Sequence, residues 1–282
     1  MTGQTSATSA TLERAIPSSG EMIPVVGCGT WQTFDVDPSS EEIDGPKAVV
    51  SSMIRNGGRL IDSSPMYGRA EQVTGEILSR GTLRDQVFLA TKIWTRGREE
   101  GVDQMERSFR LLQTRVIDLM QVHNLLDLET HLPTLQEWKA QGRIRYLGVT
   151  HYTDSAHGDL ERAIRTGAFD FVQLNYSLVD RAAEKRLLPA AKDLGVAVLA
   201  NRPFGEGSLV RSLGRTPLPA FAQELGCRSW PELALKYVVS NTSVTCAIPA
   251  TSNPQHMTQN MLAASGEALT ETQRNQIVGA IA

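Results

Sequence analysis

The strongest constraint in this sequence is a regular alternation between short apolar segments and longer segments with helical spacing. Residues 117–123 form one apolar segment, and residues 130–141, which follow after a short connection, have the pattern of a helix. Eight such strand-helix units can be counted, with strands predicted at residues 24–30, 60–62, 87–92, 117–123, 145–150, 171–175, 196–200 and 244–248. Eight repeats with short connections favour a closed parallel barrel over an open eight-stranded sheet.

Further elements are predicted outside the repeats. Residues 14–16 and 22–24 flank a turn at residues 18–20, which predicts an N-terminal β-hairpin. The fold class is therefore α/β, a (β/α)8 TIM barrel with an N-terminal β-hairpin and extra C-terminal helices. Residues 1–11 are rich in Thr, Ser and Ala without an apolar core, so we predict a disordered tail there and a single domain over residues 12–282.

Several helix starts are predicted from N-cap patterns. Capping boxes are predicted at Ser39 with Glu42, at Ser229 with Glu232 and at Thr270 with Gln273. Thr216 before Pro217, and Asn253 before Pro254, have the pattern of an N-cap followed by proline at the first helical position.

The composition limits the classes of partner. The net charge is −3, and Lys and Arg are scattered, which argues against binding to nucleic acid. No apolar run reaches the roughly 18 residues that a membrane helix needs. The three cysteines, Cys28, Cys227 and Cys246, are far apart, which indicates free thiols rather than disulfides or a zinc site. We expect a cytoplasmic protein without a metal site, as a monomer or a small homo-oligomer.

Polar side chains follow the predicted strands at their carboxyl ends. In a barrel these ends meet at one face, where active sites are built. The residues at these positions are Trp31, Asp62, Lys92, His123, Thr150, His151, Asn175, Asn201 and Arg202. Each has a structural explanation when taken alone, such as a solvated strand end for Lys92 or a core histidine for His123. Their repetition on successive strands predicts one shared site.

Tyr67 adds a proton donor to this set, because it follows Asp62 by five residues across a turn that opens a loop. A tyrosine with a pKa near 10 is a poor donor at pH 7. A neighbouring Lys92 would lower that pKa and make the phenol a better acid, while Asp62 keeps the lysine charged and oriented. His123 can hydrogen-bond a substrate oxygen. A proton donor beside a carbonyl needs a source of hydride, which indicates a nicotinamide cofactor.

These residues lie in motifs that resemble those of the aldo-keto reductases. The motifs are Gly27-Cys-Gly-Thr-Trp31, Asp62-Ser-Ser-Pro-Met-Tyr-Gly-Arg-Ala-Glu71, Thr91-Lys92, Asp118-Leu-Met-Gln-Val-His123, Gly142-Arg-Ile-Arg-Tyr-Leu-Gly-Val149, Gln173-Leu-Asn-Tyr-Ser177 and Ile248-Pro249. The resemblance covers about residues 14–272. It implies an NAD(P)(H)-dependent oxidoreductase on a (β/α)8 barrel that reduces small aldehydes or ketones to alcohols.

The resemblance also implies roles for the residues at the strand ends. Tyr67 matches the general acid, Lys92 and Asp62 match the pair that tunes its pKa, and His123 matches the group that orients the carbonyl. Trp31 and Trp94 would line an apolar substrate mouth, with ordinary barrel packing as the alternative explanation for both.

Further positions match the family's cofactor site. Thr150 and Gln173 match residues that hydrogen-bond the nicotinamide carboxamide. His151 stands where the family usually has Asn, and Asn201 stands where many members stack an aromatic ring on the nicotinamide. Arg202 is expected to reach the cofactor pyrophosphate as a planar donor of several hydrogen bonds, with a surface salt bridge as the alternative.

The last predicted strand bears on the choice between NADP(H) and NAD(H). Many relatives carry a Lys and an Arg there that contact the adenosine 2′-phosphate, and Ala250 and His256 stand at those positions here. Hydrogen-bonding residues without fixed charge remain nearby, namely Thr251, Ser252, Gln259 and Asn260. The resemblance implies NADP(H) as the favoured cofactor, and NAD(H) stays possible.

Two other functions stay open on the sequence. The channel-associated β subunits of this family act chiefly as cofactor-sensing regulatory or binding modules, and such a role is the first alternative. A (β/α)8 lyase or isomerase outside the family is the second, and it would require the motif matches to be accidental. Failure to bind any nicotinamide would be the first support for that second alternative.

Overall fold

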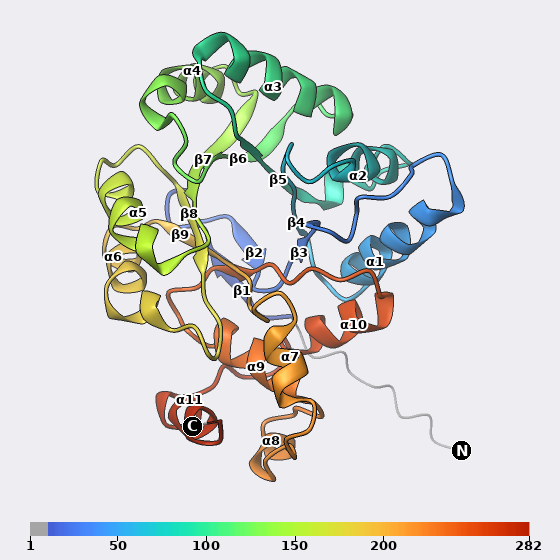
Figure 1. Cartoon of the computed structure of the whole chain (residues 1–282), viewed down its shortest axis with the longest axis vertical. Coiled ribbons are helices and arrows are strands. Elements are labelled where there is room, and N and C mark those ends of the chain that lie inside the picture. The colour runs from blue at the N-terminus through green and yellow to red at the C-terminus, as the bar shows by residue number, and fades with distance from the viewer. Residues whose placement is uncertain (1–10, 282) are drawn as a thin grey trace.

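The chain forms a barrel of parallel strands surrounded by helices (Figure 1). The computed structural model describes residues 11–281. Most of the predicted tail, residues 1–11, lies outside the described residues, but Thr11 forms an isolated antiparallel bridge with Ser265. The predicted (β/α)8 barrel and its N-terminal hairpin are confirmed.

The barrel closes between its first and last strands. Its strands are β3 (Cys28–Gly29), β4 (Leu60–Asp62), β5 (Phe88–Ile93), β6 (Ile117–His123), β7 (Ile144–Thr150), β8 (Phe171–Asn175), β9 (Ala197–Asn201) and β10 (Cys246–Ala247), paired in parallel in chain order. The amide of Gly27 donates to the Ala247 carbonyl at 2.9 Å, and that of Gly29 donates to the Pro249 carbonyl at 3.1 Å. Because of this closure, the carboxyl ends of all the strands surround one opening.

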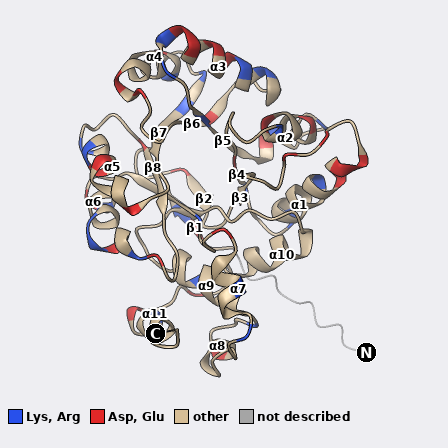
Figure 2. Cartoon of the chain, viewed as in Figure 1, with Lys and Arg blue, Asp and Glu red and all other residues tan. Residues whose placement is uncertain are grey.

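Helices cover the outside of the barrel. They are α1 (Asp44–Arg55), α2 (Ala70–Leu78), α3 (Arg98–Leu111), α4 (Leu128–Ala140), α5 (His157–Ile164), α6 (Leu187–Asp193), α7 (Ser208–Leu213), α8 (Phe221–Glu224), α9 (Trp230–Val239), α10 (Pro254–Leu262) and α11 (Glu271–Gly279). In α3, Met105 and Phe109 are buried on the face toward the core, one helical turn apart. Acidic and basic residues alternate along these outer helices, without a segregated region of one charge in the view of Figure 2. Among the described residues, no helix has both the length and the apolar composition needed to cross a membrane.

The N-terminal hairpin plugs one end of the barrel. Its strands, β1 (Glu13–Ala15) and β2 (Met22–Pro24), are antiparallel. Ile16 and Ile23 are fully buried and belong to the apolar cluster that fills the barrel interior, together with Leu60, Phe88, Leu119 and Phe171. Leu60, Phe88 and Phe171 are the first residues of their strands. The hairpin therefore seals the amino ends of the strands and leaves the carboxyl ends open.

Two predicted helix starts are wrong. The predicted cap at Ser39 is replaced by Ser40, whose hydroxyl accepts from the Glu42 amide at 3.2 Å, because the Ser39 hydroxyl donates to Asp37 Oδ1 instead. No helix begins at Thr216, and α8 starts later, at Phe221. Residues 216 and 218 each precede a proline, and the residue before a proline is driven out of the helical region. The caps at Ser229, Asn253 and Thr270 are confirmed, and Thr270 forms the full capping box with Gln273. The predicted box at Ser229 is only half formed, because the Glu232 carboxylate accepts from the Arg228 amide instead.

Two barrel strands are shorter than predicted. The segments 24–30 and 244–248 contribute only the two-residue strands β3 and β10 to the barrel, and Pro24 ends the hairpin strand β2. In the first segment, the amide of Val25 donates to the carbonyl of Leu12, while the carbonyl of Val25 accepts from the amide of Ala247. The backbone of Val25 thus bonds the N-terminal segment with its amide and the barrel with its carbonyl. The regular hydrogen bonding of a parallel strand pair is interrupted there, so the strand is short.

At Gly75, helix α2 approaches the end of α3 closely. A Cβ atom there would lie 2.0 Å from the Leu111 carbonyl oxygen, at the end of α3, whereas a Cβ on Gly158 in α5 would meet nothing within 4 Å. We expect Gly75→Ala to lower the free energy of unfolding by about 1–3 kcal/mol or to prevent folding, since the neighbour is backbone. Gly158→Ala should leave it unchanged or raise it by up to about 1 kcal/mol. Urea unfolding of both variants checks the pair, and equal stability would contradict the close approach.

Candidate active site

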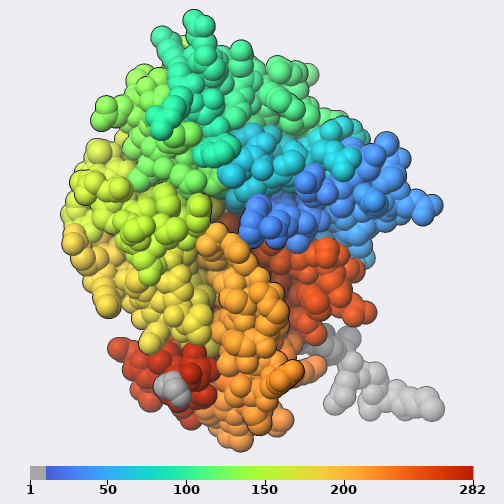
Figure 3. All heavy atoms as spheres, in the orientation of Figure 1, coloured from blue at the N-terminus to red at the C-terminus, as the bar shows by residue number. Residues whose placement is uncertain are grey.

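A cavity of about 440 Å³ opens at the carboxyl ends of the strands. Its wall includes most of the predicted site residues, namely Trp31, Asp62, Tyr67, His123, Thr150, Gln173, Asn201 and Arg202. Figure 3 shows the segment after β9 (orange) crossing the centre of this face, beside the blue segment of the early chain. A volume of this size is typical of sites for small ligands and cofactors.

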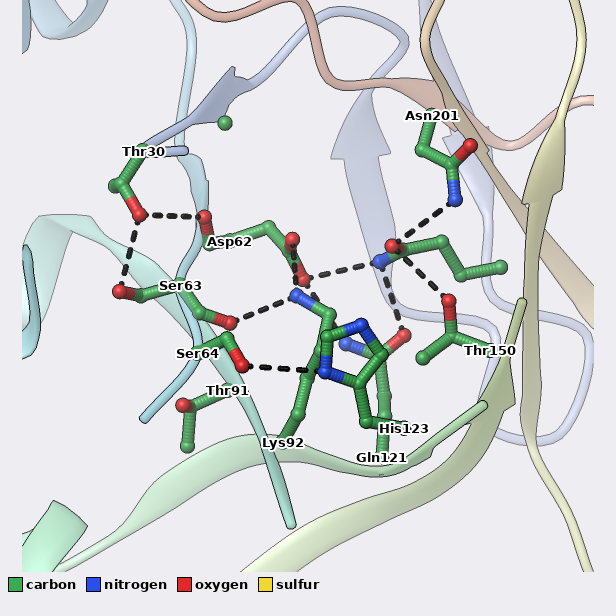
Figure 4. Close-up of polar contacts among 12 residues, drawn as sticks. Thr30, Asp62, Ser63, Ser64, Thr91, Lys92, Gln121, His123, Thr150 and Asn201 are labelled. Atoms are coloured by element: carbon green, nitrogen blue, oxygen red, sulfur yellow. Dashed lines mark hydrogen bonds and ion pairs between the residues drawn. The ribbon is translucent and has the colours of Figure 1, made fainter. Parts of the chain in front are cut away.

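A buried ion pair lies beneath the cavity. Lys92, at the end of β5, is fully buried, and its Nζ donates to Asp62 Oδ2 at 2.6 Å and to the Ser63 carbonyl at 2.8 Å (Figure 4). Burial alone would lower the pKa of Lys92, but Asp62 and the nearby Tyr67 outweigh it and raise the pKa above its ordinary value. Lys92 is therefore a permanent positive charge at neutral pH.

The second oxygen of Asp62 is held by amides. Oδ1 accepts from Gln121 Nε2 at 2.9 Å and from Gln173 Nε2 at 3.0 Å. Both carboxylate oxygens are thus hydrogen-bonded, as a buried carboxylate requires. Donors from β5, β6 and β8 converge on this residue of β4, so the register of these strands orients it.

Tyr67 stands next to Lys92, with the ammonium 5.0 Å from the centroid of the phenol ring. Burial raises the pKa of Tyr67, and although the charge of Lys92 acts to lower it, the net direction is upward. The predicted effect of Lys92 thus has the expected sign, but desolvation of the phenolate outweighs it and the pKa of Tyr67 does not fall. Tyr67 is a neutral phenol that carries its proton at pH 7.

His123 is a neutral imidazole in the cavity wall. Burial, with smaller contributions from Lys92 and His151, lowers its pKa to about 3. Its Nδ1 lies 3.3 Å from Ser64 Oγ, and its ring packs edge-to-face against Tyr67 with centroids 6.2 Å apart. A neutral imidazole with one nitrogen engaged can use the other to donate to, or accept from, a ligand.

Gln173 links the ion pair to the opposite wall. Its Oε1 accepts from Thr150 Oγ1 at 3.1 Å and from Asn201 Nδ2 at 3.3 Å, while its Nε2 donates to Asp62 and Gln121. Asn201 Nδ2 also donates to the His151 carbonyl at 3.1 Å, which orients the amide. Its Oδ1 is shielded from water and has no hydrogen-bond partner among the described residues. That unpaired acceptor lies in a residue of the cavity wall.

Comparison with known proteins identifies the family. A family model described as the aldo/keto reductase family matches residues 25–282. The chain belongs to the aldo/keto reductase family. It is 30% identical to methylglyoxal reductase YeaE of Escherichia coli, over 88% of each protein. It is also similar to a Klebsiella pneumoniae aldo-keto reductase solved in complex with NADPH, with a TM-score of 0.81, 25% identity, and coverage of 95% of this chain and 94% of the other. The resemblance predicted from the motifs, and the oxidoreductase class, are confirmed.

Several residues predicted for this aldo/keto reductase site do not line its cavity. The ring of His151 turns back on its own loop, where Nδ1 accepts from the Tyr152 amide at 2.9 Å. Trp94 is 40% exposed and lies beside His123, with ring centroids 6.4 Å apart, but outside the cavity wall. Ile248, Pro249 and Ala250, which directly follow β10, line the cavity, but four predicted residues further along the chain do not: Ser252 and Gln259 are exposed, and Thr251 and Asn260 are buried.

Other residues of the site were missed on the sequence. Gln121 is two positions before His123 on β6, so strand alternation places both on one face and would have identified it. Tyr152, Phe204 and Glu206 also line the cavity, from the loops after β7 and β9. No periodic signal marks loop residues, because their direction depends on how each loop folds over the barrel.

The pKa of His123 predicts how stability depends on pH in this reductase. In the unfolded chain the residue binds a proton near pH 6.5, whereas in the folded protein it does so only near pH 3. The unfolded state therefore gains a proton first as pH falls, and this group should remove about 2 kcal/mol of unfolding free energy between pH 7 and pH 5. Urea unfolding measures this effect. Between pH 7 and pH 5, we expect the free energy of unfolding of His123→Asn to fall by about 2 kcal/mol less than that of the wild-type protein. An identical pH dependence in both proteins would contradict the neutral buried imidazole.

Proposed function

We propose that this aldo/keto reductase catalyses the NAD(P)H-dependent reduction of aldehydes and ketones to alcohols, with Tyr67 as the proton donor. The observation that carries the proposal is the charged, buried Lys92, which lies under the phenol ring of Tyr67 in the wall of the cavity. A phenol that keeps its proton, beside a fixed positive charge, is the arrangement needed to protonate an alkoxide as it forms.

Tyr67, Lys92, Asp62 and His123 have different roles in the proposed proton transfer. Tyr67 releases its proton to the carbonyl oxygen as negative charge develops there. Lys92 stabilises the phenolate that is left, and Asp62 keeps Lys92 oriented through the 2.6 Å contact. Because a proton on an imidazole of pKa about 3 is not available at neutral pH, His123 acts by hydrogen-bonding the substrate oxygen rather than as the acid.

The cavity suits a nicotinamide dinucleotide. Asn201 Oδ1 is a buried acceptor without a partner, and Thr150 Oγ1 still has free lone pairs after donating to Gln173. A carboxamide offers N–H donors to both acceptors. When bound, the reduced nicotinamide supplies the hydride that a carbonyl needs. Arg202 in the same wall is a cation for the phosphates.

NADP(H) is the favoured cofactor, with NAD(H) as a second substrate of the same site. The structural relative from Klebsiella pneumoniae holds NADPH, which supports NADP(H). Ala250 and His256 provide no fixed charge for a 2′-phosphate, so we expect a modest preference. The Escherichia coli relative is a methylglyoxal reductase, which supports small carbonyl compounds as the substrate class. A panel of such compounds, with either cofactor, tests the proposal by cofactor consumption. Cofactor binding without turnover of any carbonyl would instead favour a cofactor-sensing module.

Tyr67→Phe tests the identity of the acid. Only the phenolic proton is lost, so we expect kcat to fall by roughly 100-fold or more while the Kd for NADPH stays within about 2-fold. Tyr146→Phe is the matched control, because its hydroxyl bonds Ser19 and Glu21 at the sealed end of the barrel. Wild-type turnover by Tyr67→Phe would exclude this residue as the proton donor.

Lys92→Met tests the buried charge. We expect turnover to fall by roughly 100-fold or more, since the phenolate loses its partner, and stability to fall by about 3–5 kcal/mol because Asp62 is left unpaired. Lys139→Met removes a Lys–Asp contact of the same 2.6 Å length, to Asp170, outside the cavity. That control should keep full turnover. Circular dichroism separates lost folding from lost chemistry, and an active Lys92→Met protein would refute the role of the charge.

A further inference from the structure

The loop after β9 carries an ion pair in the cavity wall. Arg202 Nη2 lies 2.6 Å from Glu206 Oε1, and the guanidinium carbon lies 4.2 Å from the centroid of the Tyr152 ring. All three residues line the cavity. The side chains of Arg202 and Glu206 are 37% and 41% exposed. The guanidinium is thus held on two sides, yet a ligand in the cavity can reach it.

Arg202 is the one lysine or arginine among the described residues that line the cavity. Lys92 lies deeper and is committed to Asp62 and Ser63. An anionic group that enters the cavity therefore has a single fixed cation to meet there. Before it arrives, the carboxylate of Glu206 occupies that cation.

The backbone brings Glu206 back onto Arg202 by unusual means. Arg202 and Glu206 have left-handed backbones, with φ of 51° and 56°, and so do Gly205 and Gly207. The amide of Gly205 donates to the Arg202 carbonyl at 2.8 Å and closes the turn. Two non-glycine residues in this region cost more than a half-exposed ion pair contributes. The pair is therefore not explained by stability, and strain of this kind is concentrated at ligand sites.

We propose that Arg202 and Glu206 form an anion-responsive latch, in which Glu206 holds the guanidinium over Tyr152 until the diphosphate of a nicotinamide dinucleotide displaces it. This inference rests on the proposed function, because it needs such a ligand in the cavity. Glu206 then acts as an internal competitor that weakens cofactor binding and speeds cofactor release. The diphosphate, shared by NADH and NADPH, is the group recognised.

Glu206→Gln tests the latch, because it removes the competing charge and keeps the size of the side chain. We expect the Kd values for NADH and for NADPH to fall together by roughly 2- to 5-fold, the size typical of an exposed ion pair. Quenching of intrinsic fluorescence measures both, since Trp31 lines the cavity. The gain should shrink in about 0.5 M salt, which screens exposed charges.

Glu106→Gln is the matched control. Glu106 holds Arg143 at 2.8 Å, the Arg143 guanidinium lies 3.8 Å from the Trp138 ring, and the Arg143 and Glu106 side chains are 31% and 37% exposed. This second Arg–Glu–aromatic group lies outside the cavity wall. Its loss should leave both Kd values unchanged.

A double-variant cycle separates the latch from simple repulsion. Arg202→Gln should weaken the binding of both cofactors. In the double variant, Glu206→Gln should restore little of the affinity that it adds to the wild-type protein. An equal gain in affinity in the absence of Arg202 would show that Glu206 only repels the cofactor, which would overturn the latch. Unchanged or weaker cofactor binding by the Glu206→Gln variant would also overturn it. Tightening for NADPH alone would overturn the assignment to the diphosphate. If the wild-type protein bound neither nucleotide, the proposed function itself would fall, whereas binding without any effect of Glu206→Gln would remove only the latch.

Discussion

The buried ion pair between Lys92 and Asp62 is the interaction on which the rest of the site depends. Removing two charges from water costs several kcal/mol for each ion, and only short contacts with further hydrogen bonds offset that cost. Residues of four strands and the adjoining Ser63 provide these contacts. Lys92 and Asp62 lie 2.6 Å apart, the Ser63 carbonyl accepts a second hydrogen bond from Lys92, and Gln121 and Gln173 donate hydrogen bonds to Asp62. A shift in the register of any of these strands would leave a charge unpaired.

The two ends of the barrel differ in how completely their polar groups are paired. At the sealed end, the polar groups pair with one another: Arg145 contacts both Asp118, at 2.7 Å, and Glu21 of the hairpin, at 2.5 Å. At the open end, Asn201 Oδ1 is left without a partner, and Arg202 adopts a left-handed backbone. Unpaired acceptors and backbone strain are tolerated where a ligand satisfies them, and the sealed end provides the stability that makes this possible.

Much of this architecture could be predicted from the sequence. The strands at residues 117–123 and 171–175 have the predicted bounds, because each is a short, mainly apolar segment that ends on a polar residue. Asp62, Lys92 and His123 lie at the carboxyl ends of their strands, so closure of the barrel brings them together. The lowering effect of Lys92 on the pKa of Tyr67 was predicted, but the larger opposing effect of burial was not, since burial cannot be read from the spacing of residues. The ring of His151 and the side chain of Trp94 miss the cavity because their loops turn them away.

The sequence by itself determined the repeat of strand and helix, and with it the barrel, the end at which chemistry collects, and the residues that meet there. These follow from hydrophobic periodicity and from the order of polar residues at strand ends, which are local properties of the chain. Only the tertiary structure decided the protonation of Tyr67 and His123, the unpaired oxygen of Asn201, and the closing of Glu206 onto Arg202. Burial, hydrogen-bond partners and loop direction arise from segments far apart in the chain, so no local pattern encodes them.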